Sequence, residues 1–138
     1  MNLIEISIAK LIATTPDNVF EAWLNPQTPG GPWYGVERVI INPVVNGMYY
    51  HAVKHQGRTW SHYGRFLKVK RYKSLEFTWV SEATQGIESI VSLTFQPQDD
   101  QTLVTLVHSQ VPDDERGRRH REGWNWVLSN LAKQFAPN

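Results

Sequence analysis

Two histidines that a tight turn brings face to face are the residues with the clearest capacity for chemistry. Residues 48–55 are MYYHAVKH, residues 58–69 are RTWSHYGRFLKV, and only a Gln-Gly dipeptide separates the two segments. A two-residue loop between two such segments predicts a β-hairpin of fixed register, in which His51 lies opposite His62. Their Cβ atoms are then expected about 5 Å apart on one face of the sheet.

A facing pair of histidines could bind a metal ion, orient a ligand or transfer protons. A metal site needs at least a third ligand, for which His108 and Glu88 are the only evident candidates. The sequence has neither an HxH nor an HExxH spacing, and no carboxylate falls in register with the pair. We therefore expect no metal ion and no cofactor, and we interpret the pair as polar groups in a cavity wall. Burial among apolar neighbours would lower the pKa of each ring and keep it neutral at pH 7.

Other candidates for chemistry carry weaker signals. Tyr49 lies on the histidine face and could help to polarise a carbonyl group, whereas Tyr63 and Arg65 fall on the opposite face by strand parity. The chain has no cysteine, no serine in a Gly-x-Ser-x-Gly context and no phosphate-binding glycine loop. The sequence therefore names no catalytic residue.

The composition restricts the partners and the compartment. The 14 Lys and Arg residues nearly balance the 13 Asp and Glu residues, which argues against nucleic acid as the main partner. The basic stretch RGRRHRE at 116–122 follows three acidic residues, and we interpret it as a solvated helix face. No apolar run approaches the ~18 residues of a membrane span, and residues 1–10 do not have the pattern of a signal peptide. We therefore expect a cytoplasmic protein without a membrane span, which the absence of cysteine fits, although that absence is also compatible with export.

Aromatic residues are the most distinctive part of the composition. The chain contains 6 Trp, 5 Tyr and 5 Phe, together 12% of its residues. Aromatic rings can simply fill a core, but so many rings with polar tips suit a pocket for a partly apolar molecule. We therefore expect a small apolar ligand as a partner.

Hydrophobic periodicity predicts a strand, a short helix, six further strands and a long final helix. The first strand covers 4–14, the short helix falls within 14–26, and the six strands lie between 36 and 109. A hairpin is expected around the polar turn QPQDDQ. In the register that keeps one of its faces apolar, the facing pairs are Phe95–Val104, Leu93–Leu106 and Val91–His108.

The final helix contains HREGWNWVLSNLAKQF at 120–135, with Asp113 as the expected N-cap. An interior glycine costs a helix about 1 kcal/mol, so we expect Gly123 to allow close approach to a neighbouring element. Trp124 begins an apolar stripe and is assigned to the cavity or core. Trp126 lies about 200° around the helix and is assigned to the rim or a partner surface. The alternative is that both indoles only pack against the sheet and loops.

These elements predict a single domain over residues 1–138, of class α+β. A strongly curved antiparallel sheet wrapped around the long C-terminal helix would bury the apolar faces.

The segments ATTPDNVFEAWLNP, WYG, GRTWSHYGRFLKV, LEFTWV, ESIVSLTF, TLVTLVHSQVPDDE and HREGWNWVLSNLAKQF, in this order, resemble the START-like (SRPBCC) superfamily. Within it the sequence is most similar to the C-terminal domain of the activator of heat-shock protein 90 ATPase. The resemblance covers essentially the whole chain. It implies a helix-grip fold, in which the curved sheet and the long helix enclose an internal cavity.

The sequence departs from this family in two respects. The eukaryotic co-chaperones carry an additional N-terminal domain that does much of the chaperone stimulation, and it has no counterpart here. TPGGP also stands where relatives often have a helical turn, which predicts a looser cavity mouth. A chaperone is therefore the less supported partner.

The expected function is the binding of a small hydrophobic or aromatic, lipid- or polyketide-like molecule without catalysis. Two alternatives stay open. One is a cyclase- or hydrolase-type enzyme that uses His and Tyr groups of the cavity; the other is a co-chaperone-like stress-response protein, with a homodimer or a chaperone complex as its assembly. The candidate cavity residues are Trp23, Trp33, Tyr49, His51, Trp60, His62, Phe66, Phe77, Trp79, His108, His120, Trp124 and Leu128.

Overall fold

The computed structural model describes residues 2–27 and 38–137. In chain order its elements are β1 (Leu3–Ile12), α1 (Pro16–Leu24), β2 (Arg38–Ile41), β3 (Met48–His55), β4 (Arg58–Lys70), β5 (Ser74–Ser81), the 3-10 turn η1 (Glu82–Thr84), β6 (Ser89–Gln98), β7 (Gln101–Pro112), α2 (Glu115–Arg118) and α3 (His120–Gln134). The predicted order of strand, helix, six strands and C-terminal helix is confirmed, and with it the α+β class.

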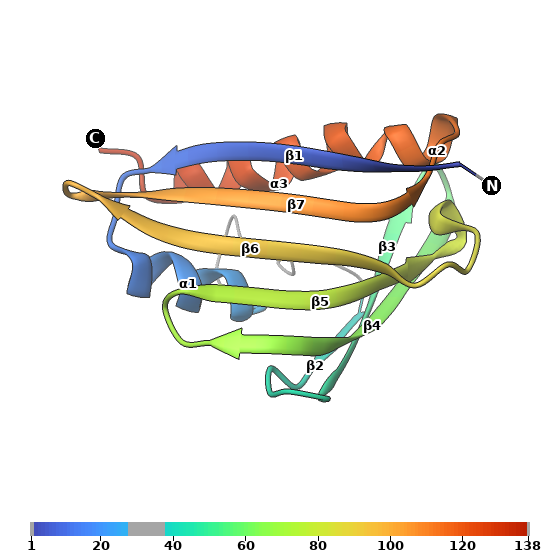
Figure 1. The fold of residues 1–138 in the computed structure, drawn as a ribbon, viewed down its shortest axis with the longest axis horizontal. Coiled ribbons are helices and arrows are strands. Elements are labelled where there is room, and N and C mark those ends of the chain that lie inside the picture. The colour runs from blue at the N-terminus through green and yellow to red at the C-terminus, as the bar shows by residue number, and fades with distance from the viewer. Residues whose placement is uncertain (1, 28–37, 138) are drawn as a thin grey trace.

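The seven strands form one antiparallel sheet in the order β1-β7-β6-β5-β4-β3-β2. Strands β1 and β2, which flank α1 in the sequence, therefore lie at opposite edges. Figure 1 shows β3 and β4 running at a steep angle to β6 and β7, so the sheet curves, and α3 lies along the β1–β7 side. A curved antiparallel sheet held against a C-terminal helix is the helix-grip arrangement.

The β3–β4 hairpin has the predicted register, with His51 opposite His62. Its two loop residues both have positive φ, 53° at Gln56 and 72° at Gly57. This is the conformation of a type I′ turn, whose twist matches that of the paired strands. The turn therefore fixes which residues of the two strands meet.

The β6–β7 hairpin also confirms the predicted register. The strands continue further into the polar segment than expected and leave only Asp99 and Asp100 as the loop. The facing pairs are Phe95–Val104, Leu93–Leu106 and Val91–His108.

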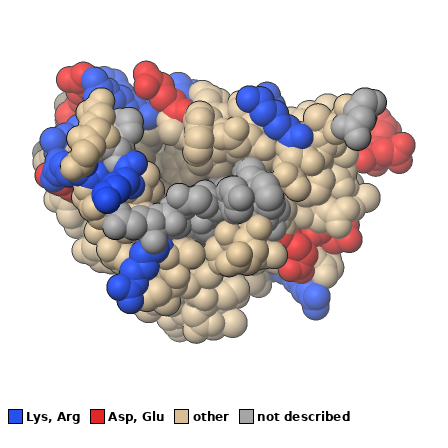
Figure 2. Space-filling model, turned by 180° about the vertical axis from the view of Figure 1, so that it is seen from behind, with Lys and Arg blue, Asp and Glu red and all other residues tan. Residues whose placement is uncertain are grey.

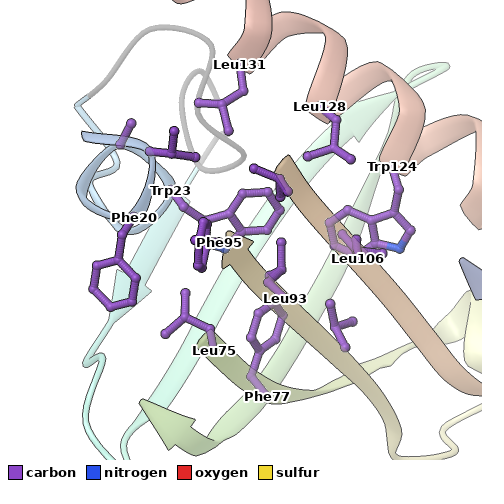
Figure 3. Packing of buried hydrophobic residues seen from close by; sticks show 14 of the residues in the cluster. Phe20, Trp23, Leu75, Phe77, Leu93, Phe95, Leu106, Trp124, Leu128 and Leu131 are labelled. Carbon is purple, nitrogen blue, oxygen red and sulfur yellow. The ribbon is translucent and has the colours of Figure 1, made fainter. Parts of the chain in front are cut away.

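The core lies between the inner face of the sheet and the two longer helices. Figure 3 shows Trp124, Leu128 and Leu131 of α3 pointing toward the sheet. Phe20 and Trp23 of α1 close one side of the same core. The residues of β5 that are buried beneath them include Leu75, Phe77 and Trp79.

The start of the C-terminal helix differs from the prediction. The helix is divided at Arg119 into α2 and α3. The N-cap is Asp114, whose Oδ1 accepts a hydrogen bond from the backbone N–H of Gly117 at 2.7 Å. The expected cap, Asp113, instead pairs with Arg118 at 2.9 Å. The side chain of Asp114 points toward the first helical turn, and Asp114 rather than Asp113 therefore caps the helix.

The expectation for Gly123 is wrong, and Gly117 has the role assigned to it. Among the described residues, a Cβ on Gly123 would meet nothing outside its own helix within 4 Å. A Cβ on Gly117 would collide with the carbonyl oxygen of Pro112 and lie 3.1 Å from Cγ1 of Val111. The missing side chain at Gly117 therefore lets α2 pack directly on the end of β7.

The two glycines make a matched test of this packing. Gly123→Ala should raise the free energy of unfolding by up to about 1 kcal/mol, because alanine is the better helix former. Gly117→Ala should lower it by about 2 kcal/mol or more, because backbone atoms would have to move. Urea denaturation followed by tryptophan fluorescence measures both values, and the reverse ranking would contradict the assignment.

Candidate functional site

A continuous set of aromatic and histidine rings lies where β3, β4 and β5 approach the N-terminus of α3. Trp79 of β5 is at its centre. Among the described residues, the ring centroids within 6.5 Å of the Trp79 ring are those of Tyr49, His51, His62, Phe77, His108 and Trp124. These residues and Trp79 are called the Trp79 cluster. Three of its rings are imidazoles, so ionisable groups lie in aromatic surroundings with little access to water.

The predicted histidine pair is present and stacked. The rings of His51 and His62 have centroids 4.6 Å apart and planes within 6° of parallel. Burial, together with the smaller effect of the neighbouring His62, lowers the pKa of His51 to about 3. Burial also lowers the pKa of His62 to about 4, together with the charge of His120 and against the effect of the Trp60 backbone. Both imidazoles are therefore neutral at pH 7.

The stacked geometry does not suit a metal ion. The nitrogen lone pairs of an imidazole lie in the plane of its ring, so two parallel rings do not direct them to a common point. Glu88, a suggested third ligand, instead pairs with Arg65 at 3.2 Å. Within residues 2–27 and 38–137, no group of three His, Asp or Glu side chains is arranged to hold a metal.

His108 lies in a chain of hydrogen bonds that fixes its tautomer. The indole Nε1 of Trp124 donates to Nδ1 of His108 at 3.0 Å, and an indole nitrogen can only donate. The Oγ of Ser89 lies 2.7 Å from Nε2 of the same ring and donates its one proton to the carbonyl oxygen of Trp79 at 2.5 Å. The proton of the imidazole is therefore on Nε2 and points at Ser89. Burial lowers the pKa of His108 to about 3, which agrees with a neutral ring.

In the observed arrangement, these hydrogen bonds rule out Ser89 as a nucleophile activated by His108. The imidazole nitrogen that faces Ser89 already carries a proton, and the hydroxyl proton of Ser89 points at a backbone carbonyl. The four groups instead connect α3, β7, β6 and β5.

His120 extends the set of imidazoles at the beginning of α3. Its ring meets that of His108 edge to face, with centroids 4.9 Å apart. Its Nδ1 lies 2.9 Å from the carbonyl oxygen of Gly117 and must donate to it, because a carbonyl only accepts. Burial is the main cause that lowers the pKa of His120.

The expectation that Tyr49 polarises a ligand carbonyl is not supported. Its hydroxyl group donates to the carbonyl oxygen of Thr78 at 2.5 Å, and burial raises the pKa of Tyr49 well above 10. The ring lies against Gly64, its partner across the hairpin, where a Cβ would be 2.7 Å from Cε1 of the tyrosine. Tyr49 is therefore fixed by its packing against Gly64 and by a hydrogen bond that uses its single hydroxyl proton.

Trp60 lies at the edge of the site. The guanidinium groups of Arg58 and Arg116 lie 4.2 Å and 5.4 Å from its ring centroid. Both arginines also pair with Glu82, and all three charged side chains are about half exposed. The charged side chains of Arg58, Glu82 and Arg116 thus lie beside Trp60, at the exposed edge of the aromatic residues.

Several ring nitrogens in this region are buried and have no hydrogen-bond partner among the described residues. They include Nε1 of Trp23, Trp60 and Trp79 and Nδ1 of His62. Trp23 belongs to the same packed set of rings, because it stacks on Trp124 with centroids 6.2 Å apart and planes at 26°. The N–H groups of Trp23 and Trp79 are thus buried donors for which the described residues provide no acceptor.

The structure brings most of the predicted site residues together. Phe66 joins the cluster through Tyr49, with centroids 6.0 Å apart, and Leu128 lies in the core beside it. Trp60 is at the rim, and Trp33 lies outside the described residues. Trp126 is 69% exposed, in line with its assignment to a surface.

Sequence reasoning missed Ser89 as a partner of His108. The signal was available, because the predicted register set His108 opposite Val91, and Ser89 is two residues away on the same face. From the sequence, serine was treated only as a possible nucleophile, and not as a residue that hydrogen-bonds to both an imidazole and a backbone carbonyl.

The chain also matches a known family. Residues 13–136 match the family described as activator of Hsp90 ATPase homolog 1-like protein. The chain belongs to this family. No curated protein is similar enough to count as a match.

Solved structures support the START-like fold of this family member. CV1439 from Chromobacterium violaceum is 20% identical, with a TM-score of 0.78 over 97% of this chain and 98% of that one. CalU16 from Micromonospora echinospora is 22% identical, with a TM-score of 0.74 over 96% of this chain and 76% of that one. Aha1 from Colwellia psychrerythraea, described as a dimer in solution, is 15% identical, with a TM-score of 0.73 over 96% of both chains. At these identities the likeness establishes the fold alone.

In the part of the chain that the structure describes, no helix combines the length and the apolar character needed to cross a membrane.

The buried histidines predict a steep loss of stability in acid. The pKa values of His51 and His108 fall to about 3 and that of His62 to about 4, from 6.5. Between pH 6.5 and about 4 the unfolded chain binds protons that the folded chain does not. The stability that depends on these neutral histidines should therefore be fully present above pH 6.5. As the pH falls below 6.5, the free energy of unfolding should decrease by up to about 1.4 kcal/mol per pH unit for each histidine.

Urea denaturation at a series of pH values between 7 and 4.5 measures this slope. His62→Phe should reduce the slope by about one proton, and Tyr63→Phe, on the outer face, should leave it unchanged. A slope that His62→Phe does not alter would contradict the low pKa of His62.

Proposed function

We propose that this protein binds a small, largely apolar molecule on the inner face of its sheet, at the Trp79 cluster, without converting it chemically. The observation that carries the proposal is the pair of buried indole N–H groups, on Trp23 and Trp79, that have no partner among the described residues. Most buried N–H groups in native proteins are hydrogen-bonded, because an unpaired one costs about 1–3 kcal/mol. A ligand atom that accepts such a hydrogen bond would offset this cost.

The surroundings of these N–H groups suit a small-molecule site. The Trp79 ring lies 4.8 Å from that of Trp124, which in turn stacks on Trp23. Apolar and aromatic walls with a few polar groups are the usual composition of such sites.

The protonation states favour binding over catalysis. At pH 7, imidazoles with pKa values of about 3 and 4, as at His51 and His62, are weak bases for proton transfer. The protons of His108, Ser89 and Tyr49 are already used in hydrogen bonds. The cyclase- or hydrolase-type alternative would depend on Nδ1 of His62, which has no partner in the described part of the chain.

Native mass spectrometry of the protein purified from its own host tests the proposal. One small molecule per chain should be bound and recoverable by extraction. His62→Phe keeps a flat ring but removes its nitrogens, so retention should fall about fivefold or more if the ligand meets that ring. Tyr63→Phe, the next residue on the outer face, should retain the molecule as the natural protein does.

Two results would contradict the proposal. A mass without any bound molecule would remove its basis, and pull-down of a protein partner would follow. Chemical conversion of the extracted molecule by the purified protein would establish the enzyme alternative instead.

A second proposal concerns association of two copies through the outer face of β2, β3 and β4. Ile40 and Met48 are each 56% exposed and Tyr63 is 48% exposed. Ile40 and Tyr63 both flank Tyr50 in the sheet register, so these side chains are neighbours. Exposed apolar side chains that are grouped mark interaction surfaces. The similar Aha1 from Colwellia psychrerythraea is described as a dimer. A chaperone is the alternative occupant of this face.

Size-exclusion chromatography with light scattering over a range of concentrations tests the dimer. Met48→Asp should shift the equilibrium toward monomer at least tenfold, because it places a charge in the contact. Leu11→Asp, at a 39% exposed position on β1 at the other edge, is the matched control and should have no effect. A natural protein that is monomeric at all concentrations would exclude the proposal.

A further inference from the structure

We propose that the turn between β2 and β3, together with the basic side chains around it, docks the protein on an anionic lipid surface. The contact is peripheral: an apolar corner of the turn enters the headgroup region, and lysine and arginine side chains meet the lipid phosphates. It is separate from the binding of a small molecule inside the fold. Two features of the described residues carry it, the apolar corner of the turn and the distribution of charge along the chain.

The β2–β3 turn has a fixed backbone and an apolar corner. The backbone N–H of Gly47 donates to the carbonyl oxygen of Val44 at 2.7 Å, and Asn46, the third residue of the turn, has a φ of 67°. A positive φ at this position is that of a type II turn. Val44 and Val45 are 53% and 56% exposed, although turns favour Gly, Pro, Asn, Asp and Ser. The turn therefore presents two apolar side chains to the outside, where polar residues are usual.

Hydrogen bonds hold this turn against β4. The backbone N–H of Asn46 donates to the carbonyl oxygen of Phe66 at 2.8 Å, and the N–H of Phe66 donates to the carbonyl oxygen of Gly47 at 2.9 Å. Figure 1 shows the turn at the lower edge of the molecule, beside β4. Figure 2 shows the same lower edge from behind, where it carries no charged side chain and has Lys or Arg side chains to either side.

The basic residues of the chain are concentrated in this region. Residues 38–73, from β2 to the turn between β4 and β5, contain eight Lys and Arg residues and no Asp or Glu. The rest of the chain has the other six of the 14 basic residues and all 13 acidic ones. The net charge of +1 is therefore the sum of a strongly basic segment and an acidic remainder, and it does not describe the charge around the turn.

Most of these basic side chains are not paired with carboxylates. Arg58 pairs with Glu82 and Arg65 with Glu88. Glu76 lies opposite one of the lysines in the strand register and offsets part of the charge, without forming a salt bridge. In the part of the chain that the structure describes, the other six basic residues are exposed and take part in no salt bridge; they are Arg38, Lys54, Lys68, Lys70, Arg71 and Lys73.

These two features together fit a lipid surface better than other anionic partners. Exposed apolar side chains with polar groups around them mark interaction sites. A lipid surface has a layer of phosphates over an apolar layer, so lysines and valines contribute to one contact. A nucleic acid offers phosphates to the lysines but no aliphatic layer to the valines.

Sedimentation of the purified protein with lipid vesicles tests the proposal. Vesicles of equal parts of phosphatidylglycerol and phosphatidylcholine should bind the protein at low salt. Vesicles of phosphatidylcholine alone should bind it about tenfold more weakly or less, because they have no net charge to attract the basic side chains. Added salt should weaken binding to the mixed vesicles, since it screens exposed charges.

A pair of valine substitutions tests the apolar corner. Val44→Ser combined with Val45→Ser should weaken binding to the mixed vesicles about fivefold or more, because less apolar surface leaves water. Leu3→Ser combined with Leu11→Ser, at exposed positions on β1, is the matched control and should bind as the natural protein does.

A pair of lysine substitutions tests the charge. Lys68→Gln combined with Lys70→Gln should weaken binding to the mixed vesicles about tenfold or more, since each cation near an anionic surface contributes about fivefold. Lys10→Gln combined with Lys133→Gln removes the same charge from exposed positions on β1 and α3 and should have little effect.

The outcomes separate this surface from the other proposals. Equal binding to both kinds of vesicle, or binding to neither, would overturn the lipid surface. Tighter binding to an oligothymidylate than to the mixed vesicles would assign the basic residues to a nucleic acid instead. A valine variant that keeps vesicle binding but loses self-association in light scattering would assign the turn to a contact between copies. The small molecule detected by native mass spectrometry should be retained in all four variants, so failure on vesicles leaves the interior site unaffected.

Discussion

The hydrogen bond from the Trp124 indole to Nδ1 of His108 is the contact on which the organisation of the interior depends. This hydrogen bond, with 3.0 Å between the two nitrogens, connects the C-terminal helix to the sheet. It also requires the imidazole proton to be on Nε2, which faces Ser89. Ser89 in turn donates a hydrogen bond to the backbone carbonyl of Trp79 in β5. A protonated His108 could not accept from the indole. The same hydrogen bond that connects the helix to β7 therefore requires a neutral His108.

Removal of the histidine rings from water keeps them neutral, and this affects the stability of the fold. Burial is the largest cause of the low pKa values of His51, His62 and His108. The imidazoles are neutral at pH 7, and at this pH they are weak bases for proton transfer. In acid they become the groups through which the fold is lost, because only the unfolded chain can protonate them freely.

The sequence predicted the faces and registers of the sheet well, because short turns determine them locally. The two-residue loop at Gln56 and Gly57 was sufficient to set His51 opposite His62. The roles of the helix glycines could not be predicted in the same way. Gly117 and Gly123 are both glycines on one helical segment, and only the path of β7 shows which of them meets another backbone. Tyr49 was placed on the correct face, but the acceptor of its hydroxyl proton is a carbonyl of another strand.

The amino-acid sequence by itself determined the order of the elements, the alternation that turns the aromatic residues inward and the family to which the chain belongs. The order and the alternation follow from periodicity and turn geometry, which act over a few neighbouring residues, and the family follows from the match of residues 13–136 to its model. Only the tertiary structure decided which ring nitrogens have partners, which tautomer His108 adopts and how far each histidine is removed from water. Those properties depend on distances between β5, β7, α1 and α3, which no local pattern specifies.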